Sequence, residues 1–232
     1  MVEPLLWRRA QDAILSRIVA GEWGPGAALP SETELGAALG VSQGTTRKAL
    51  AELERAGVVE RRQGRGTFVA RATPERSLFH FFRLRRRDGS PAAPELERET
   101  LRRRRATARE RAALDDAAVI EIARLRRVDG RPGARETIAL PAALFPGLIE
   151  RAPLPNTLYV LYQQAYGVAV TRAEEALSAT AADAADAEAL GVAEGAPLLQ
   201  VEREAYDLRG RRVELRTSRY RTDGLRYSVT LR

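Results

Sequence analysis

The sequence predicts an α+β protein with two domains, a helical N-terminal domain that ends in a β-hairpin and a C-terminal domain built on an antiparallel sheet. The N-terminal part has apolar residues at helical spacing, interrupted by glycine turns. Later segments alternate apolar and polar residues on both sides of turn sequences, which is typical of antiparallel hairpins and not of a doubly wound sheet. A chain of 232 residues is long enough for two such cores.

The first two expected helices follow from spacing and capping. Apolar residues recur at helical spacing from Leu6 to Ile18, and Gly21 ends the pattern. After a turn-rich connection, Ser31 and Glu34 form a capping box, because the side chain of each can hydrogen-bond the backbone N–H of the other. A short second helix is therefore expected to begin after Ser31 and to end in a glycine turn.

A third helix and a hairpin complete the N-terminal domain. Ser42 is expected to cap the third helix, and Gly57 ends it. Two short helices joined by a tight turn form a helix-turn-helix. Alternating residues on both sides of a glycine turn then form a hairpin, the wing. The assignments are residues 1–71 for the domain, about 31–56 for the helix-turn-helix and 58–70 for the wing, with Gly64, Arg65 and Gly66 at its tip.

Two long hairpins dominate the second half of the chain. One crosses the turn Asp129-Gly130, and the other crosses residues 207–210. The expected strands are 119–128, 136–140, 198–206 and 211–220. The expected helices run from a cap at Thr157 to Tyr166 and from Asp183 to near Gly191. We assign residues 72–91 to a linker and residues 92–232 to this second domain.

Charge is distributed unevenly along the chain. The formal net charge is +7, of which residues 1–71 contribute +2, residues 72–111 contribute +6 and residues 112–232 contribute −1. A basic N-terminal half fits contact with nucleic acid, although net charge alone is weak evidence. The balanced C-terminal half is expected of a domain that does not itself hold DNA.

Composition excludes several classes of site. The chain has no cysteine, which excludes disulfides and thiolate metal sites. Its single histidine, His80, lies in an apolar run and is expected to pack, so a Ser-His-Asp triad is not expected. No apolar run reaches about 18 residues, and charges interrupt the first 21 residues, so neither a membrane span nor a signal peptide is expected. We therefore expect a cytoplasmic protein without catalytic residues, metal or cofactor.

Five motifs follow one another in the N-terminal domain over about residues 5–70. They are Leu29-Pro30-Ser31-Glu32-x-Glu34-Leu35, Leu39-Gly40-Val41-Ser42, Thr46-Arg47-x-Ala49-Leu50-x-x-Leu53, Gly57-Val58-Val59 and Gly64-x-Gly66-Thr67-Phe68-Val69. In this order they resemble the signature of GntR-family winged-helix regulators. The resemblance implies sequence-specific binding to double-stranded operator DNA, with the third helix in the major groove.

The resemblance also implies which residues contact DNA. The residues expected at base edges are Ser42, Gln43, Gly44, Thr45 and Arg47, those expected at phosphates are Ser31, Thr33, Thr45 and Lys48, and those at the wing tip are Gly64, Arg65 and Gly66. Arg47 can bond guanine O6 and N7, and Gln43 can bond adenine N6 and N7. Ser31 and Ser42 cap helices whether or not they touch DNA, and Lys48 can simply be solvated. The family often has arginine in place of Gln43 and a hydroxyl residue in place of Gly44, so the operator is expected to differ from the common consensus.

A second, more diffuse series of motifs spans roughly residues 92–230. It comprises Arg124-Leu125-Arg126, Asp129-Gly130-x-Pro132, Glu136, Leu140-Pro141, Leu144-Phe145-Pro146-Gly147-Leu148, Leu158-Tyr159, Tyr166-Gly167-Val168, Leu190-Gly191-Val192, Gly195-x-Pro197-Leu198-Leu199, Val201-Glu202-Arg203, Glu214 and Tyr220-Arg221-x-Asp223. This series resembles a UTRA effector domain, which marks the HutC branch of the GntR family and is similar in fold to chorismate lyase. The resemblance implies a pocket for one small metabolite.

The resemblance assigns roles to eight residues of that pocket. Arg124 and Arg126 match positions that bind an anionic group, Glu136 and Glu214 match anchors for hydroxyl or amine groups, and Thr157, Tyr159 and Tyr220 match pocket-lining positions. Sugar-phosphate-binding relatives often carry serines before the first strand of this domain. Here only Ser90 is available, and whether it replaces their hydroxyls stays open. Two other roles are also open, because Arg124 can form an outward ion pair and Glu136 can neutralise Arg126.

The sequence therefore favours a homodimeric repressor whose operator binding is modulated by a small anionic metabolite. Dimerisation and repression are expectations from the family, and a dimer would match a near-palindromic operator. Two alternatives come from other classes. One is a lyase-like enzyme with Glu136 or Glu214 as acid or base, which no catalytic motif supports. The other is a nonspecific nucleic-acid binder, whose affinity would depend almost wholly on salt.

Overall fold

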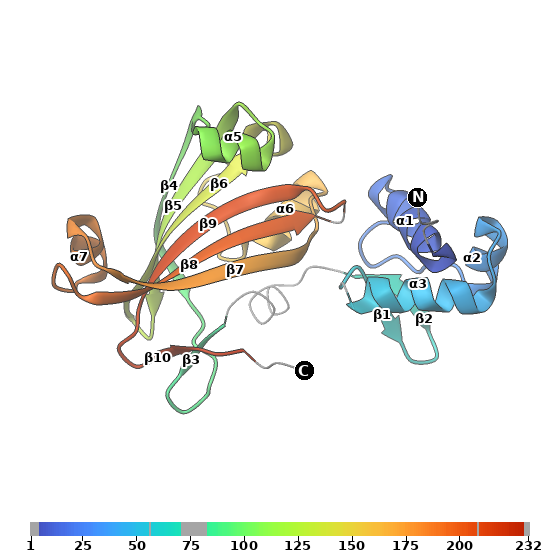
Figure 1. Ribbon diagram of the computed structural model, residues 1–232, viewed down its shortest axis with the longest axis horizontal. Helices are drawn as coiled ribbons and strands as arrows, with labels where there is room; N and C mark the ends of the chain where they lie inside the picture. Colours follow the sequence, from blue (N-terminus) through green and yellow to red (C-terminus); the bar gives the residue numbers. More distant parts are fainter. Residues whose placement is uncertain (1–4, 56, 71–82, 208, 230–232) are drawn as a thin grey trace. The chain divides into compact units, whose positions relative to one another are not determined.

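The computed structural model describes residues 5–55, 57–70, 83–207 and 209–229. The chain divides into two compact units, Met1–Ala72 and Thr73–Arg232, which we call the N-terminal and C-terminal units. Figure 1 shows the helical character of the first unit and the large sheet of the second. Most of the predicted linker, 72–91, and His80 lie outside the described residues. No helix within the described ranges is long and apolar enough to cross a membrane.

The N-terminal unit has the predicted winged helix-turn-helix. Its helices are α1 (Leu6–Val19), α2 (Glu32–Leu39) and α3 (Gln43–Arg55), and its wing pairs β1 (Val59–Arg62) antiparallel with β2 (Gly66–Val69). Ile14, Leu35, Leu50 and Leu53 are almost fully buried and form the centre of the unit. Helices α2 and α3 approach closely at Gly36, where an added Cβ would lie 2.9 Å from the carbonyl oxygen of Val41. This close approach fixes the position of α3 relative to α2.

The C-terminal unit is built on one antiparallel sheet of six strands in the order β4-β5-β6-β9-β8-β7. The strands are β4 (Glu95–Arg105), β5 (Ala118–Val128), β6 (Arg131–Pro141), β7 (Val170–Ala181), β8 (Pro197–Asp207) and β9 (Arg212–Arg221). A separate small pair joins β3 (Leu84–Arg86) to β10 (Leu225–Tyr227). Both predicted hairpins are present, and the α+β class is confirmed.

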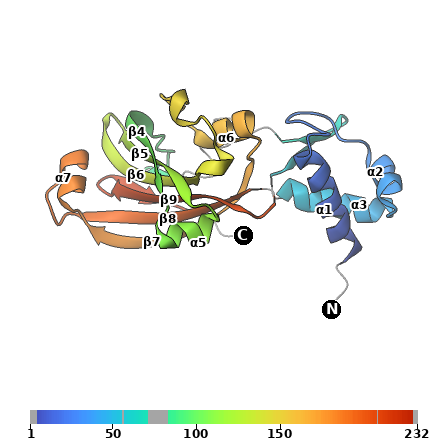
Figure 2. The ribbon, with the colours of Figure 1, turned by 90° about the horizontal axis from the view of Figure 1, so that it is seen from above.

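Helices cover both faces of this sheet. Helix α6 (Leu158–Tyr166), with the short 3-10 helices η1 (Ala142–Leu144) and η2 (Ile149–Arg151), packs on the face of Ile122 and Ile138. Helices α5 (Ala108–Leu114) and α7 (Ala184–Leu190) cover parts of the other face, around Val119 and around Leu125. Figure 2 shows α5 and α6 on opposite sides of the strands.

Three details of the C-terminal unit differ from the sequence-based expectations. Strand β6 begins at Arg131, not at Glu136, because the turn at Asp129 and Gly130 is tight and the pairing starts at once. The predicted cap at Thr157 is wrong in one respect: Thr157 occupies the N-cap position of α6, but its side chain makes no cap hydrogen bond. Helix α5 and strand β7 were not expected from the sequence, and the alanines and glutamates of β7 do not alternate in hydrophobicity.

Candidate operator-binding surface and effector site

Helices α2 and α3 each begin at a serine cap. The Ser31 hydroxyl accepts a hydrogen bond from the backbone N–H of Glu34 at 3.2 Å, and the Glu34 carboxylate accepts from the Ser31 N–H at 2.8 Å, so the predicted capping box is confirmed. The Ser42 hydroxyl accepts from the Thr45 N–H at 3.2 Å and lies 2.9 Å from the Thr45 hydroxyl. Both serines therefore stabilise helix ends, as one interpretation of the sequence required.

The residues predicted to read bases lie on an accessible part of α3. Gln43, Gly44 and Arg47 are exposed, whereas Thr46 between them is buried and donates its hydroxyl hydrogen to the Ser42 carbonyl at 3.2 Å. Arg47 is not free in orientation, because its Nε donates to Glu32 Oε2 at 2.9 Å. The structure therefore brings the predicted base-reading side chains to one surface and ties one of them to α2.

The other predicted DNA contacts occupy different environments. Thr33 is exposed on α2. The Lys48 ammonium lies 5.0 Å from the ring centroid of Trp7 in α1, so it is engaged in a cation–π contact. At the wing tip, Gly64 and Gly66 have φ of 68° and 99°, values that favour glycine, and Arg65 between them is exposed. The tip thus presents one arginine on a turn that only glycines form without strain.

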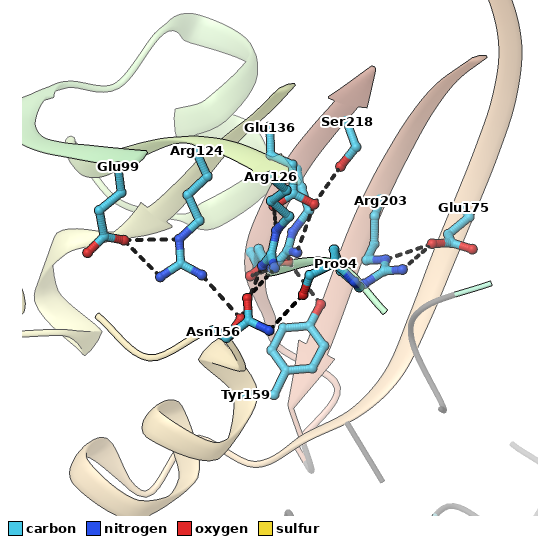
Figure 3. Close-up of polar contacts among 12 residues, drawn as sticks. Pro94, Glu99, Arg124, Arg126, Glu136, Asn156, Tyr159, Glu175, Arg203 and Ser218 are labelled. Atoms are coloured by element: carbon cyan, nitrogen blue, oxygen red, sulfur yellow. Dashed lines mark hydrogen bonds and ion pairs between the residues drawn. The ribbon is translucent and has the colours of Figure 1, made fainter. Parts of the chain in front are cut away.

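The predicted effector residues of the strands share one face of the six-stranded sheet. Arg124 pairs with Glu136 across β5 and β6, and Glu136 pairs with Ser218 across β6 and β9. Directly opposed residues point to the same side of a sheet. Four arginines and four glutamates lie on this face, which we call the charged face: Arg124, Arg126, Arg203, Arg216, Glu99, Glu136, Glu175 and Glu214. All of them except Arg216 and Glu214 are labelled in Figure 3.

Arg124 and Arg126 are held by other groups of the protein. The Arg124 side chain is fully buried, and its Nε and Nη2 donate to Glu99 Oε2 at 3.1 and 2.8 Å. Arg124 also donates to the carbonyls of Pro155 and Asn156. Arg126 donates to Glu136 Oε2 at 2.5 Å and to Asn156 Oδ1 at 2.7 Å, as Figure 3 shows. The two arginines therefore organise the loop before α6 in this structure.

Glu136 is a buried carboxylate at the centre of the charged face and is ionised at neutral pH. Burial raises its pKa, but the Arg126 and Arg216 guanidinium groups outweigh burial and bring the pKa to about 2. Its second oxygen accepts from the Ser218 hydroxyl at 3.3 Å and lies 3.7 Å from Arg216 Nη1. Glu136 thus neutralises Arg126, which is one of the two roles that the sequence left open.

Glu214 joins the sheet to α6. Its two oxygens accept from the hydroxyls of Tyr159 at 2.9 Å and Tyr162 at 3.0 Å, and both also accept from Arg216 at 3.0 Å. Burial and the Glu214 charge raise the pKa of both tyrosines, so both phenols are donors at neutral pH. Glu214 and Tyr159, predicted separately, are in direct contact.

Three predicted pocket residues lie apart from this centre. Tyr220 is buried with Leu84, Ala92 and Ala134 at another part of the face, in a separate apolar cluster. Thr157 follows Asn156 and is half-buried. Ser90 lies in a turn, where its hydroxyl donates to Asp88 at 2.7 Å and accepts from Arg86 at 3.2 Å. Among the described residues, no hydrogen bond joins Ser90 to Arg124 or Arg126.

Sequence reasoning missed half of the charged face. Glu99, Glu175, Arg203 and Arg216 lie on it, and Asn156 bridges it to the start of β4. The signal for Arg216 was present, because Glu214, Arg216 and Ser218 alternate at the two-residue period of a strand. Asn156 carried no such signal. No group of three metal-ligating side chains is found within the described part of the chain.

Comparisons with known proteins agree with this architecture. Residues 6–69 match the model of the bacterial regulatory proteins of the gntR family, and residues 94–226 match the UTRA domain. The chain is 27% identical to the HTH-type transcriptional repressor NagR of Bacillus subtilis, over 94% of this chain and 91% of that protein. It is 32% identical to the HTH-type transcriptional regulator Rv0792c of Mycobacterium tuberculosis, over 95% and 83%.

A solved structure covers both units. The crystal structure of PhnF from Mycobacterium smegmatis superposes with a TM-score of 0.56 at 28% identity, covering 95% of this chain and 98% of that chain. Each family model matches one of the two units, and one relative above 30% identity spans most of both chains. The chain therefore belongs to the GntR family, with a UTRA domain after its winged helix-turn-helix, and is a sequence-specific DNA-binding transcription regulator.

Proposed function

We propose that this regulator is a homodimeric repressor, and that a small anionic metabolite binding at the charged face changes its affinity for operator DNA. The observation that carries the proposal is the contact set of Asn156. Its Oδ1 accepts from Arg126 Nη1 at 2.7 Å, and its Nδ2 donates to the Pro94 carbonyl at 2.8 Å. One side chain thus connects the predicted anion-binding arginine to the residue just before β4.

The charged face has the chemistry of a ligand site more than that of a structural core. Burying ion pairs is costly compared with packing apolar residues, so a core gains little from eight charges. Its charges balance, with four arginines and four glutamates. An incoming anion therefore has to replace an existing partner of Arg124 or Arg126. These partners are Glu99, Glu136 and the loop at 154–157.

Replacement of Asn156 at Arg126 supplies a route for coupling. An anion that binds the two Nη groups of Arg126 displaces the Asn156 side chain from Arg126. Asn156 is then no longer held in the position from which it donates to the Pro94 carbonyl. The chain before Pro94 leads back to the N-terminal unit. A ligand controls DNA binding only if it favours one of two arrangements of the protein. Here the two arrangements are Asn156 bound to Arg126 and the anion bound to Arg126.

We infer that the site binds without catalysing a reaction. An efficient general acid or base has a pKa near the working pH, whereas Glu136 has a pKa of about 2, because Arg126 and Arg216 outweigh the effect of burial. Glu214 is fully committed to two phenols and Arg216. Unchanged ligand after prolonged incubation with the protein is the expected result, and turnover would support the lyase-like alternative.

For the N-terminal unit we propose that α3 reads bases through Gln43 and Arg47, that Ser31, Thr33 and Lys48 contact phosphates, and that Arg65 enters the minor groove. The exposure of these side chains supports the proposal. Each bidentate base contact is worth about 1–3 kcal/mol of discrimination. Because the operator belongs to the chromosome, we place the protein in the cytoplasm.

Two experiments, carried out one after the other, test the proposal. Selection from a random duplex library at about 150 mM salt, a condition that suppresses nonspecific binding, should enrich a short palindrome. Phosphorylated sugars and carboxylated amino-acid derivatives are then screened for thermal stabilisation of the full chain, and each hit is tested for its effect on affinity for that palindrome. Hits that stabilise wild type but not Arg126→Met, and that change operator affinity, support the proposal. An unenriched pool, or tight ligands without effect on DNA, would contradict it.

A further inference from the structure

Glu32 places a carboxylate among residues that are expected to face DNA phosphates. It is the first residue of α2 and lies between Ser31 and Thr33, both of which are predicted phosphate contacts. A negative charge there opposes binding, because affinity for DNA depends mainly on neutralised phosphates. The Glu32 side chain is nevertheless only 22% exposed, since two arginines hold it.

The contact with Arg47 leaves the end of that side chain available. Arg47 Nε donates to Glu32 Oε2 at 2.9 Å, while the Arg47 side chain remains 59% exposed. Within the described residues, neither Nη group of Arg47 forms a hydrogen bond. These two groups form the end of the guanidinium fork that can bond guanine O6 and N7 together. The Glu32 contact therefore fixes the fork without using the atoms that read a base.

A second arginine connects the pair of Glu32 and Arg47 to the wing. Arg61 of β1 donates through Nη2 to Glu32 Oε1 and to the Arg47 carbonyl, each at 3.4 Å. The Arg61 backbone N–H donates to Glu54 at 3.2 Å. Glu32 thus joins α2, α3 and β1, three elements of the N-terminal unit that Figure 1 labels. An arginine loses rotamer freedom when it is fixed. Because Glu32 already holds Arg47, part of that loss precedes DNA binding.

We propose that Glu32 is a positioning residue for sequence readout, which holds the Arg47 guanidinium end-on toward a guanine. Its negative charge at the same time weakens the affinity of the protein for DNA of any sequence. The proposal rests on the guanine contact proposed above for Arg47. It predicts that specificity and nonspecific affinity respond differently to changes at Glu32, which a purely structural role in α2 would not produce.

Two variants of the full chain separate position from charge. Glu32→Asp keeps the charge and suits the first turn of a helix, but it is too short to reach Arg47. It should lower the guanine preference at one position of each half-site about tenfold, with unchanged affinity for a random 30-base-pair duplex. Glu32→Gln keeps an acceptor at the original reach and removes the charge. It should lower the preference only about threefold and raise affinity for the random duplex about two- to threefold.

Library selection with each variant supplies the readout. Arg47→Ala identifies the position that Arg47 reads. Glu52→Gln is the matched control, because Glu52 pairs with Arg55 at 2.6 Å, is 23% exposed and lies at the other end of α3. If Arg47→Ala removes no guanine preference, the proposed base contact is wrong. If Arg47→Ala removes it and Glu32→Asp retains the wild-type preference, the contact stands and the role of Glu32 is wrong. A rise in operator specificity for Glu32→Asp would also overturn the proposal.

Discussion

Replacing Glu214 by leucine should destabilise the C-terminal unit strongly and leave the N-terminal unit intact. Glu214 is fully buried and accepts hydrogen bonds from the hydroxyls of Tyr159 and Tyr162 and two from Arg216, all at 2.9–3.0 Å. Leucine fills a similar volume but accepts none of these bonds. The two phenols and the guanidinium then lose this acceptor inside the protein.

The size of the effect follows from these contacts. Removing one partner of a buried ion pair costs about 3–5 kcal/mol, and Arg216 keeps Glu136 at 3.7 Å, which favours the lower end of that range. The loss of the Glu214 acceptor adds about 1 kcal/mol for each phenol. The total is about 5 kcal/mol, which lowers the urea midpoint by about 2.5 M at a slope of about 2 kcal/mol/M. Glu214→Gln keeps one carbonyl acceptor and should lose about half as much.

The chain contains a separate spectroscopic reporter for each unit. Its two tryptophans, Trp7 and Trp23, lie in the N-terminal unit, and all six tyrosines lie in the C-terminal unit. Near-ultraviolet dichroism of tyrosine should therefore show the shift in urea, while tryptophan emission keeps its midpoint. Glu202→Gln is the control, because its exposed pair with Arg109 is worth less than about 1 kcal/mol. A tyrosine midpoint equal to that of wild type for Glu214→Leu would refute the reasoning.

Three further predictions address the rest of the molecule. Gly36→Ala should cost the N-terminal unit about 1–3 kcal/mol, because the new Cβ would lie 2.9 Å from the Val41 carbonyl oxygen; tryptophan emission in urea measures it, and no shift would contradict the close approach. The pKa of Glu136 falls from its ordinary 4.5 to about 2, so its contribution to stability is full above pH 4.5 and is lost as the pH falls from about 4.5 to about 2. The unfolding free energy of wild type should therefore fall with pH across that window, and that of Glu136→Gln should change less. Equal slopes of unfolding free energy against pH in the two proteins would contradict this prediction. Gln43→Ala should reduce one adenine preference about tenfold in library selection, and an unchanged motif would exclude Gln43 as a base reader.

The helix-turn-helix could be predicted because its signals are local. Caps act over three residues and glycine turns over two to four, so Ser31 with Glu34, and Ser42 with Thr45, are readable from sequence alone. The two long hairpins were also readable, since their strands alternate and a turn sequence separates them. In each case the residues that interact are close neighbours along the chain.

The charged face could be predicted only in part, because its contacts join residues far apart in sequence. Glu99 meets Arg124 only when β4 pairs with β5 in one register, and a shift of one residue would turn its side chain to the opposite face. Asn156 reaches Arg126 from a loop without periodicity. The likeness to UTRA domains assigned an anion to Arg124 and Arg126. The residues themselves left an ion pair of Arg124 and neutralisation of Arg126 by Glu136 open, but they did not identify Glu99 or Asn156 as partners.

The most direct test of the account is reciprocal binding of effector and operator. Once an effector is found by screening, its affinity is measured by calorimetry with the free protein and with the protein saturated by its selected palindrome. Linkage requires one factor for both effects: the factor by which operator changes the affinity for effector equals the factor by which effector changes the affinity for operator. We expect a factor of about 5- to 150-fold, the range of typical coupling. We expect this factor to be lost in Asn156→Ala, in which the bridge between Arg126 and Pro94 is missing. Equal effector affinities with and without operator would contradict the account.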